Sequence, residues 1–159
     1  MPATTLTRHV RPIAVTAGSL FAAAQLAVFL ARRGELAEVA TTGFYRWSCV
    51  LLLAGFIGLV FAAVALYDAQ AGRGGAVGTA GLIGAVTGTV LMAGDWWFET
   101  FAVPFYAEAL PPVLDVKGAG WLAFGGLLSY ATFALGWAVF GLAVLRSGAP
   151  SRAAGVALI

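Results

Sequence analysis

Charged residues are scarce in this chain. Asp, Glu, Lys and Arg make up 10% of its 159 residues, whereas 61% are hydrophobic. Ordinary soluble domains carry about 25% charged residues, so this chain has too few of them to build a water-exposed surface. The composition argues against a soluble protein with buried apolar helices, because no remaining segment is polar enough to cover them.

Cysteine and histidine are nearly absent as well. A single cysteine, Cys49, excludes both a CxxC redox pair and a disulfide within the chain. A single histidine, His9, excludes a haem held by two histidines of one chain and a histidine-rich metal cluster. We therefore expect no cofactor and no metal ion.

The motifs of common enzyme classes are also missing. The chain has neither a GxxxxGK[ST] phosphate-binding loop nor a GxSxG nucleophile elbow. The glycines of "GRGGAVGTAG" (residues 72–81) follow no predicted strand, so they do not indicate a dinucleotide site. A net charge of +2 with scattered arginines does not favour nucleic-acid binding. These absences favour a protein that is not an enzyme and has no nucleic-acid partner.

Four long apolar runs account for the shortage of charge. A bilayer core about 30 Å thick is crossed by about 20 apolar helical residues, and one charge at a helix centre costs about 2.5–3.5 kcal/mol. Asp, Glu, Lys and Arg are absent from all four runs and flank each of them. The sequence therefore predicts one all-α membrane domain: a polytopic integral membrane protein, a four-transmembrane-helix bundle with spans at 12–31, 48–67, 75–94 and 119–145.

The first run also has the basic flank of a secretory signal peptide. Its apolar part is longer than the usual stretch of about 7–15 residues, and it ends at Arg32 and Arg33 instead of a small-residue cleavage site. We therefore interpret it as a membrane span.

Four spans would divide the loops between two sides of the membrane. Face one would carry both chain ends and the 68–74 loop, and face two would carry the loops at 32–47 and 95–118. Five of the nine Lys and Arg residues lie on face one. The positive-inside rule then favours a cytoplasmic N-terminus, in a prokaryotic-type cytoplasmic membrane. Tryptophans, which prefer the headgroup level, fall at the face-two ends of the spans: Trp47, Trp96, Trp97 and Trp121.

The stretch "GDWWFETFAVPFYAEALPP" (residues 94–112) is the richest in chemistry. If the third span continues as a helix, Asp95 and Glu99 lie on the same side of it, four residues apart. Such a pair is suited to hold a cation, to pair with Arg46 or Arg32, or to share a proton. The helix is predicted to end at Val103, because the next residue is a proline.

Three interpretations of this stretch stay open. The simplest is a membrane-exit belt with an interfacial aromatic and proline-rich cap over residues 95–118. The second is a ligand or ion site under an aromatic lid, and the third is a docking surface for a partner protein. The residues of the ligand or ion site would be Asp95, Glu99, Trp96 and Trp97.

Small residues predict how the helices pack. Glycines recur every three or four residues along the third span, on one helical face, and Gly55 and Gly58 of the second span offer a matching surface. Small residues are common in membrane helices, so a purely compositional reading also stays open. The predicted packing glycines are Gly55, Gly58, Gly81, Gly84 and Gly88.

Gln25 is the polar residue that stands out inside the first span. An amide in hydrocarbon needs hydrogen-bond partners, so we expect Gln25 to be buried against a neighbouring helix, with a ligand contact as the alternative. The tail, residues 146–159, ends in the uncharged "AAGVALI". Seven helical residues cover only about 10 Å of a core of about 30 Å. The tail either lies along the membrane or begins a truncated further span, and we favour the fragment.

These observations favour a multi-pass integral membrane protein with a non-catalytic role. It would be a subunit of an assembly or a binder of lipid or another hydrophobic small molecule. Its partners would be the lipid bilayer and a second copy or another membrane protein. The alternative function is a small oligomeric carrier or channel that uses Asp95 and Glu99 at the membrane boundary.

Overall fold

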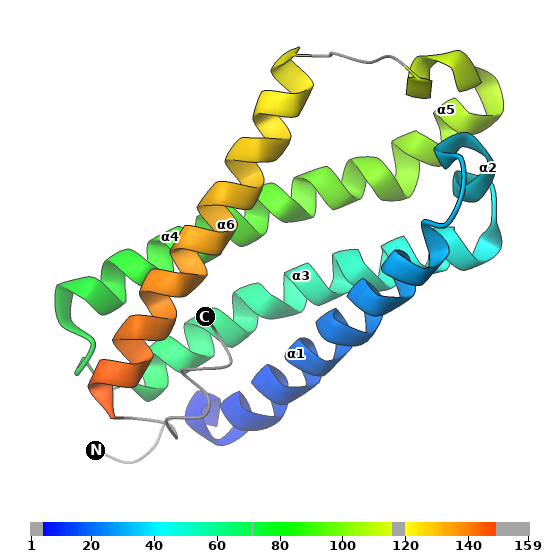
Figure 1. Cartoon of the computed structure of the whole chain (residues 1–159). Coiled ribbons are helices and arrows are strands. Elements are labelled where there is room, and N and C mark those ends of the chain that lie inside the picture. Colours follow the sequence, from blue (N-terminus) through cyan, green and yellow to red (C-terminus); the bar gives the residue numbers. More distant parts are fainter. Residues whose placement is uncertain (1–4, 71, 116–119, 149–159) are drawn as a thin grey trace.

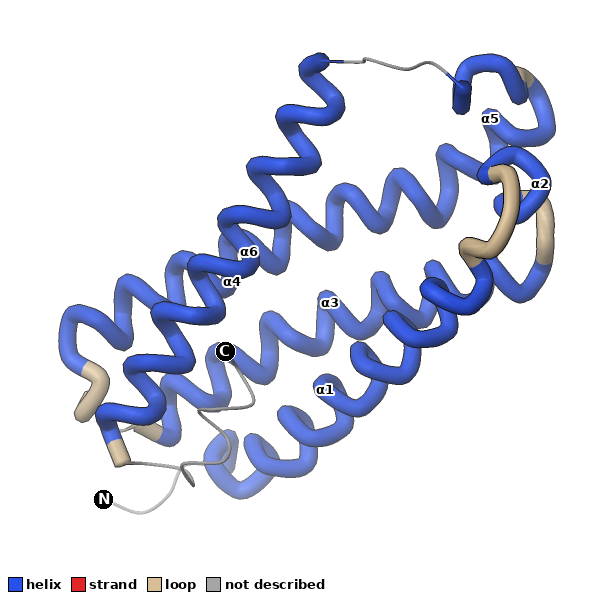
Figure 2. The backbone as a smooth tube through the Cα atoms, viewed as in Figure 1, coloured by secondary structure: helices blue, strands red, loops and turns tan. Residues whose placement is uncertain are grey.

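The chain folds into helices throughout its described part. A computed structural model describes residues 5–70, 72–115 and 120–148, and it has no strand among them. Most of the 146–159 tail and residues 116–119 therefore lie outside the described residues. The helices, shown in Figures 1 and 2, are α1 (Thr5–Ala31), α2 (Leu36–Ala40), α3 (Gly43–Ala69), α4 (Gly75–Trp97), a π-helical turn η1 (Phe98–Ala102), α5 (Val103–Ala109), a 3₁₀ turn η2 (Pro111–Asp115) and α6 (Gly120–Ser147).

Three helical segments are long and apolar enough to cross a membrane. They are Gly43–Ala69, Gly75–Ala109 and Gly120–Ser147, while the described apolar part of α1, Val15–Ala31, is shorter. Large apolar side chains cover the outside of these segments: Phe61, Ile83 and Leu135 are each more than 60% exposed. A soluble monomer rarely exposes so much contiguous apolar surface. The prediction of an all-helical fold is therefore confirmed for the described residues, and the three long apolar helices are those of a membrane protein in length and composition.

The long helices form two packed pairs, α1 with α3 and α4 with α6. Contacts between α3 and α4 join the two pairs. The Phe133 ring of α6 also reaches Phe21 of α1 and Phe56 of α3, at 6.4 and 5.7 Å between ring centroids. Figure 1 shows α6 crossing α4 and then diverging from it toward the end of the molecule where α2 and α5 lie. The arrangement leaves that end more open than the opposite one.

The glycine face of α4 packs against α6. A Cβ atom built on Gly81 would lie 2.7 Å from the Phe140 Cα atom, and one on Gly84 would lie 3.0 Å from the Gly136 Cα atom. One on Gly88 would overlap the backbone of α6 outright. In lipid, such close backbone approach replaces the hydrophobic drive that holds soluble helices together.

The prediction that Gly55 and Gly58 of α3 match the glycine face of α4 is wrong. Gly55 and Gly58 face α1, where Phe21 and Ala17 contact them, and not the glycines of α4. The physical reason is that each glycine surface accommodates the helix of its own pair. Between α3 and α4, Leu59 and Leu66 pack in one cluster with Leu82 and Val86.

Polar side chains inside the bundle bond locally. The Trp137 indole donates a hydrogen bond to the Thr89 hydroxyl at 2.9 Å, and Thr89 donates to the Ala85 carbonyl oxygen at 2.6 Å. Both donors are therefore satisfied in a buried position, as a low-dielectric interior requires. The bond ties α4 to α6 at the level of the glycine contact.

The buried glutamine of the chain is Gln70, and the expectation that Gln25 is buried is wrong. Gln70, at the end of α3, is 1% exposed, and neither its amide nitrogen nor its amide oxygen has a hydrogen-bond partner among the described residues. The Gln25 side chain is exposed. It lies on the flank of α1, one turn after Phe21, and turns toward the space between α1, α4 and α6.

The helix does not end at Val103 as predicted. It passes through Pro104 and continues to Ala109, after the π-helical turn η1. A proline in a regular α-helix lacks the N–H and clashes with the carbonyl four residues earlier, here that of Thr100. The wider turn over Phe98–Ala102 relieves that clash, and α5 then resumes regular geometry.

Candidate functional site

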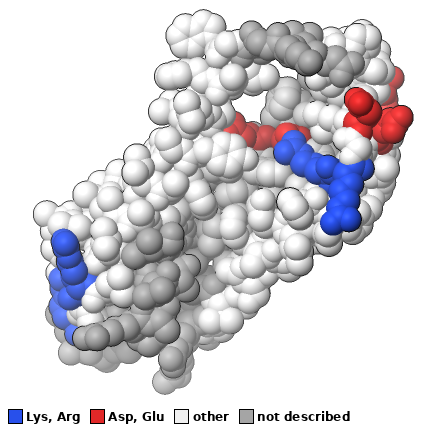
Figure 3. All heavy atoms as spheres, in the orientation of Figure 1, with Lys and Arg blue, Asp and Glu red and all other residues white. Residues whose placement is uncertain are grey.

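Charged side chains gather at the end of the molecule that carries α2 and α5. Figure 3 shows acidic and basic groups together there, whereas the visible opposite end shows only basic groups. Two ion pairs lie at the mixed end, Arg32 with Glu99 and Arg46 with Glu108. Both pairs connect elements that are far apart in the sequence.

Glu99 is the centre of the better-buried cluster, which we call the Glu99 junction: Arg32, Tyr45, Trp96 and Glu99. One carboxylate oxygen pairs with the Arg32 guanidinium, and the other accepts a hydrogen bond from the Tyr45 hydroxyl at 2.6 Å. The Arg32 guanidinium also lies over the Trp96 ring, 5.7 Å from its centroid. The junction joins the end of α1, the start of α3, α4 and η1.

Local sequence places the members of the junction. Thr42 caps α3, accepting a hydrogen bond from the Tyr45 backbone N–H at 3.3 Å, so Tyr45 stands in the first turn, with its side chain fully buried. The chain turns after Arg33 at Gly34, whose φ of +133° favours glycine. Glu99 lies within the π-helical turn, a feature that is frequent at functional sites.

Arg32 is a permanent cation at this position. Burial lowers the pKa of Arg32, but the neighbouring Glu99 carboxylate and Tyr45 raise it by more, so its pKa lies above the ordinary value. The guanidinium therefore remains charged at any physiological pH.

The second ion pair is more open to solvent. The Arg46 and Glu108 side chains are 40% and 59% exposed. Arg46 also donates from its Nε atom to the Ala40 carbonyl oxygen at 3.2 Å, so it connects α2, α3 and α5. Exposed ion pairs contribute about 0–1 kcal/mol to the stability of a fold. The role of this pair is therefore to orient the short helices α2 and α5 relative to α3.

Asp95 and Glu99 do not act as a pair of carboxylates. Both oxygens of Glu99 are engaged within the junction. Asp95 is apart from it, and its Oδ2 atom is buried without a hydrogen-bond partner among the described residues. No cluster of three metal-ligating side chains occurs in the described part of the chain.

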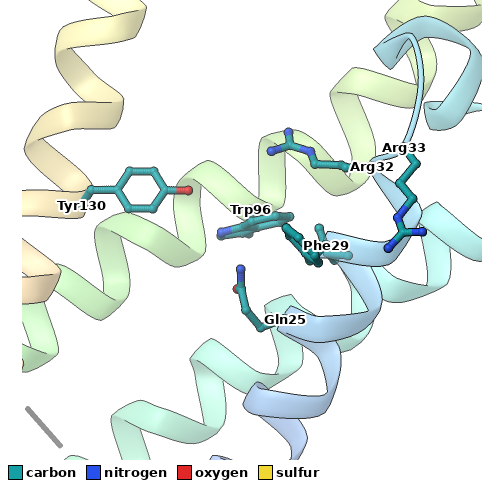
Figure 4. A pocket seen from close by; sticks show the side chains of 7 residues that line it. Gln25, Phe29, Arg32, Arg33, Trp96 and Tyr130 are labelled. Atoms are coloured by element: carbon teal, nitrogen blue, oxygen red, sulfur yellow. The ribbon is translucent and has the colours of Figure 1, made fainter.

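An open cleft of about 470 Å³ lies beside the junction, between α1, α4 and α6. Figure 4 shows Gln25, Trp96 and Tyr130 turned toward a common space from these three helices. Arg32 stands at the edge of that space, while the Arg33 guanidinium is directed aside. The cleft is lined by Gln25, Val28, Phe29, Arg32, Arg33, Trp96 and Tyr130.

The divergence of α6 opens the cleft sideways. Close contact between α4 and α6 extends to Phe133, but added Cβ atoms on Gly125 and Gly126 would meet nothing within 4 Å. Trp121 and Leu122, near the start of α6, are 87% and 67% exposed. The Phe21 ring of α1 and the Phe133 ring of α6 approach to 6.4 Å between their centroids. Few other contacts join the two helices over their described residues, so the cleft is open beyond that ring pair.

The structure distributes the expected site residues unequally. Trp96 and Glu99 belong to the junction, but Trp97 is 56% exposed and lies beside Phe101, away from the cleft. Neither Tyr45 nor Tyr130 belongs to a motif that would single it out in the sequence. A tyrosine within an otherwise apolar helix is a weak signal of a polar contact, and only the fold shows what it faces.

A comparison with known proteins does not assign this geometry to a family. The chain matches no protein-family model, no curated protein and no solved structure.

Proposed function

We propose that the protein is a four-span membrane protein that holds an amphipathic, lipid-like molecule in the cleft and has no catalytic role. The observation that carries the proposal is the cleft of about 470 Å³, which combines polar and apolar lining and opens between α1 and α6. Its volume falls within the range of about 300–1,000 Å³ typical of small-molecule sites.

The fourth span is α1. This helix has 27 residues and packs along α3, which is itself long and apolar enough to cross a membrane. A helix that lies along a spanning partner crosses the same apolar layer, and α1 exposes Leu26 and Phe29 to its surroundings. The short elements α2, α5 and η2 then form an interfacial cap on face two, with exposed Phe105 and Leu110.

Labelling of single cysteines tests the four-span topology. In a Cys49→Ala background, we expect Thr5→Cys, Arg73→Cys and Arg146→Cys to react with a membrane-impermeant maleimide from one side, since α1 and α3 both cross the bilayer between the first two positions. Ala109→Cys should react only from the other side, because α4 and α6 each cross the bilayer between these positions. Reaction of Ala109→Cys from the same side as Arg73→Cys would contradict four spans.

The lining of the cleft matches a molecule with a polar head and an apolar tail. Arg32, Trp96 and Tyr130 present N–H and O–H groups, and Val28 and Phe29 present apolar surface among them. Because the cleft is open between α1 and α6, an acyl or prenyl tail can pass into the surrounding lipid.

A binding role fits the cleft better than catalysis does. None of its described lining residues is an acid, histidine, cysteine or serine. The nearby Glu99 is already engaged by Arg32 and Tyr45. The cleft therefore offers positioning groups without a nucleophile or a general base.

Filling the cleft tests the binding function. We expect Gln25→Trp to reduce the amount of phospholipid retained by the purified protein, because the larger side chain occupies the space that Gln25 faces. Leu26→Trp is the matched control, since Leu26 is 58% exposed and does not line the cleft. Native mass spectrometry after delipidation measures the retained lipid, and equal retention by both variants would contradict the proposal.

A carrier of protons or cations is the second candidate. The buried Asp95 oxygen without a partner among the described residues favours it, because unpaired acids at membrane depth mark ion pathways. Acid-driven uptake into liposomes that is lost in Asp95→Asn and kept in Gln25→Trp would support the carrier over the lipid binder.

A further inference from the structure

We infer that the cleft selects an amphiphile with an anionic, oxygen-rich headgroup, of the phosphodiester type found in acidic phospholipids. The inference rests on the proposed lipid-binding function and specifies its ligand class. Three observations support this inference: the charge of the cleft lining, the excess of hydrogen-bond donors on its walls and the fixed position of Arg32.

The charge around the cleft is positive. Its lining includes two arginines and no acid. Glu99 neutralises one of them, Arg32, whereas Arg33 has no ion pair among the described residues. One uncompensated positive charge therefore remains at the edge of the cleft, and a ligand with a single negative charge would balance it.

Hydrogen-bond donors outnumber acceptors on the walls. The Trp96 indole and the guanidinium groups only donate, and the hydroxyl of Tyr130 and the amide of Gln25 donate as well as accept. Among the described residues, Gln25, Trp96 and Tyr130 have no side-chain hydrogen-bond partner. Phosphate and ester oxygens, which accept without donating, match this set better than an amine or a sugar does.

Arg32 is held in place before any ligand arrives. Glu99 pairs with its Nη2 atom, and the Trp96 ring lies beneath the guanidinium at 5.7 Å. A guanidinium carries five N–H donors, so the pairing leaves donors for a ligand oxygen. Holding the side chain in one geometry reduces the entropy lost on binding.

The polar groups are spread along the direction that a lipid would occupy. Gln25 lies seven residues before Arg32, about 10 Å further from the charged end of α1. A phosphate would lie near Arg32 and Arg33, and the ester carbonyls of the same lipid would lie toward Gln25 and Tyr130. The Arg33 side chain, which is directed aside, is exposed and can turn toward the phosphate.

Competition between matched lipids tests the inference. The full chain, purified in detergent, is offered equal amounts of dioleoyl phosphatidylglycerol and dioleoyl phosphatidylcholine, and native mass spectrometry counts the bound molecules of each. We expect about a fivefold preference for phosphatidylglycerol, the effect of one arginine near an anionic headgroup. Arg33→Gln should abolish most of it. Arg146→Gln, which removes an exposed arginine at the other end of α6, should leave it unchanged.

The outcomes separate the headgroup inference from the binding function. If both lipids bind equally and Gln25→Trp displaces both, the cleft binds lipid without charge selection and the headgroup inference is overturned. If neither lipid is retained, the proposed function itself fails. Displacement of phosphatidylglycerol by millimolar inorganic phosphate would show that a free anion, and not a lipid, is the ligand.

Discussion

Replacing Gly136 with alanine is expected to destabilise the protein by about 1–3 kcal/mol or more. An added Cβ atom at this position would overlap the backbone of Gly84 and Ala85, and backbone cannot move aside as the end of a flexible side chain can. The two helices would have to separate, losing the contact that holds α4 to α6. The change is measured as a lower thermal midpoint of unfolding in detergent.

Gly126→Ala is the matched control on the same helix. A Cβ atom there would meet nothing within 4 Å. Alanine is the better helix former by about 0.5–1 kcal/mol, so this variant should be as stable as the parent or slightly more stable. If Gly136→Ala and Gly126→Ala have the same midpoint, α6 does not pack on the glycine face of α4.

Removing the Glu99 carboxylate is expected to cost about 1–3 kcal/mol, the usual effect of leaving a buried donor without an acceptor. In Glu99→Ala, the fully buried Tyr45 hydroxyl loses its partner and Arg32 loses its counter-charge. Glu99→Gln retains an acceptor oxygen for Tyr45, so it should lose less. Thermal unfolding in detergent measures the series.

A double variant separates these contributions. Tyr45→Phe removes the donor, so adding it to Glu99→Ala should cost little further stability, and the two effects should not be additive. Glu108→Ala is the control for losing an exposed acid, because the Glu108 side chain is 59% exposed in its pair with Arg46. Equal losses in Glu99→Ala and Glu108→Ala would contradict a structural role for the junction.

The helical segments were predictable because their signals are local. An uninterrupted apolar run with charged flanks can be identified without knowledge of the fold. Residues 48–67, which lie within α3, are one example. Helix pairing is a long-range property that the hydropathy of a single run does not report. The glycines of α4 therefore indicated a packing face without indicating that Gly136 would meet it.

The candidate site was predictable only in part, for a similar reason. The position of a residue along a helix can be read from the sequence. The direction in which its side chain points relative to the bundle can be told only when the neighbouring helices are known. Gln25 was expected to be buried against a neighbouring helix but is exposed at the cleft, while buried Gln70 was missed at the end of α3. Glu99 was singled out as one of two acids, but its partner Tyr45 lies 54 residues away.

The pairing of α1 with α3 and of α4 with α6 also bears on how the chain is assembled during synthesis. Each pair consists of long helices that are consecutive in the sequence, so the first pair can fold as a hairpin before the ribosome has made the second. The contacts between α4 and α6 can form only after α6, the last long helix, has been made. Arg32 and Glu99 are separated by 67 residues, so the Arg32 guanidinium remains without its counter-charge until all of α4 and the start of η1 have been made.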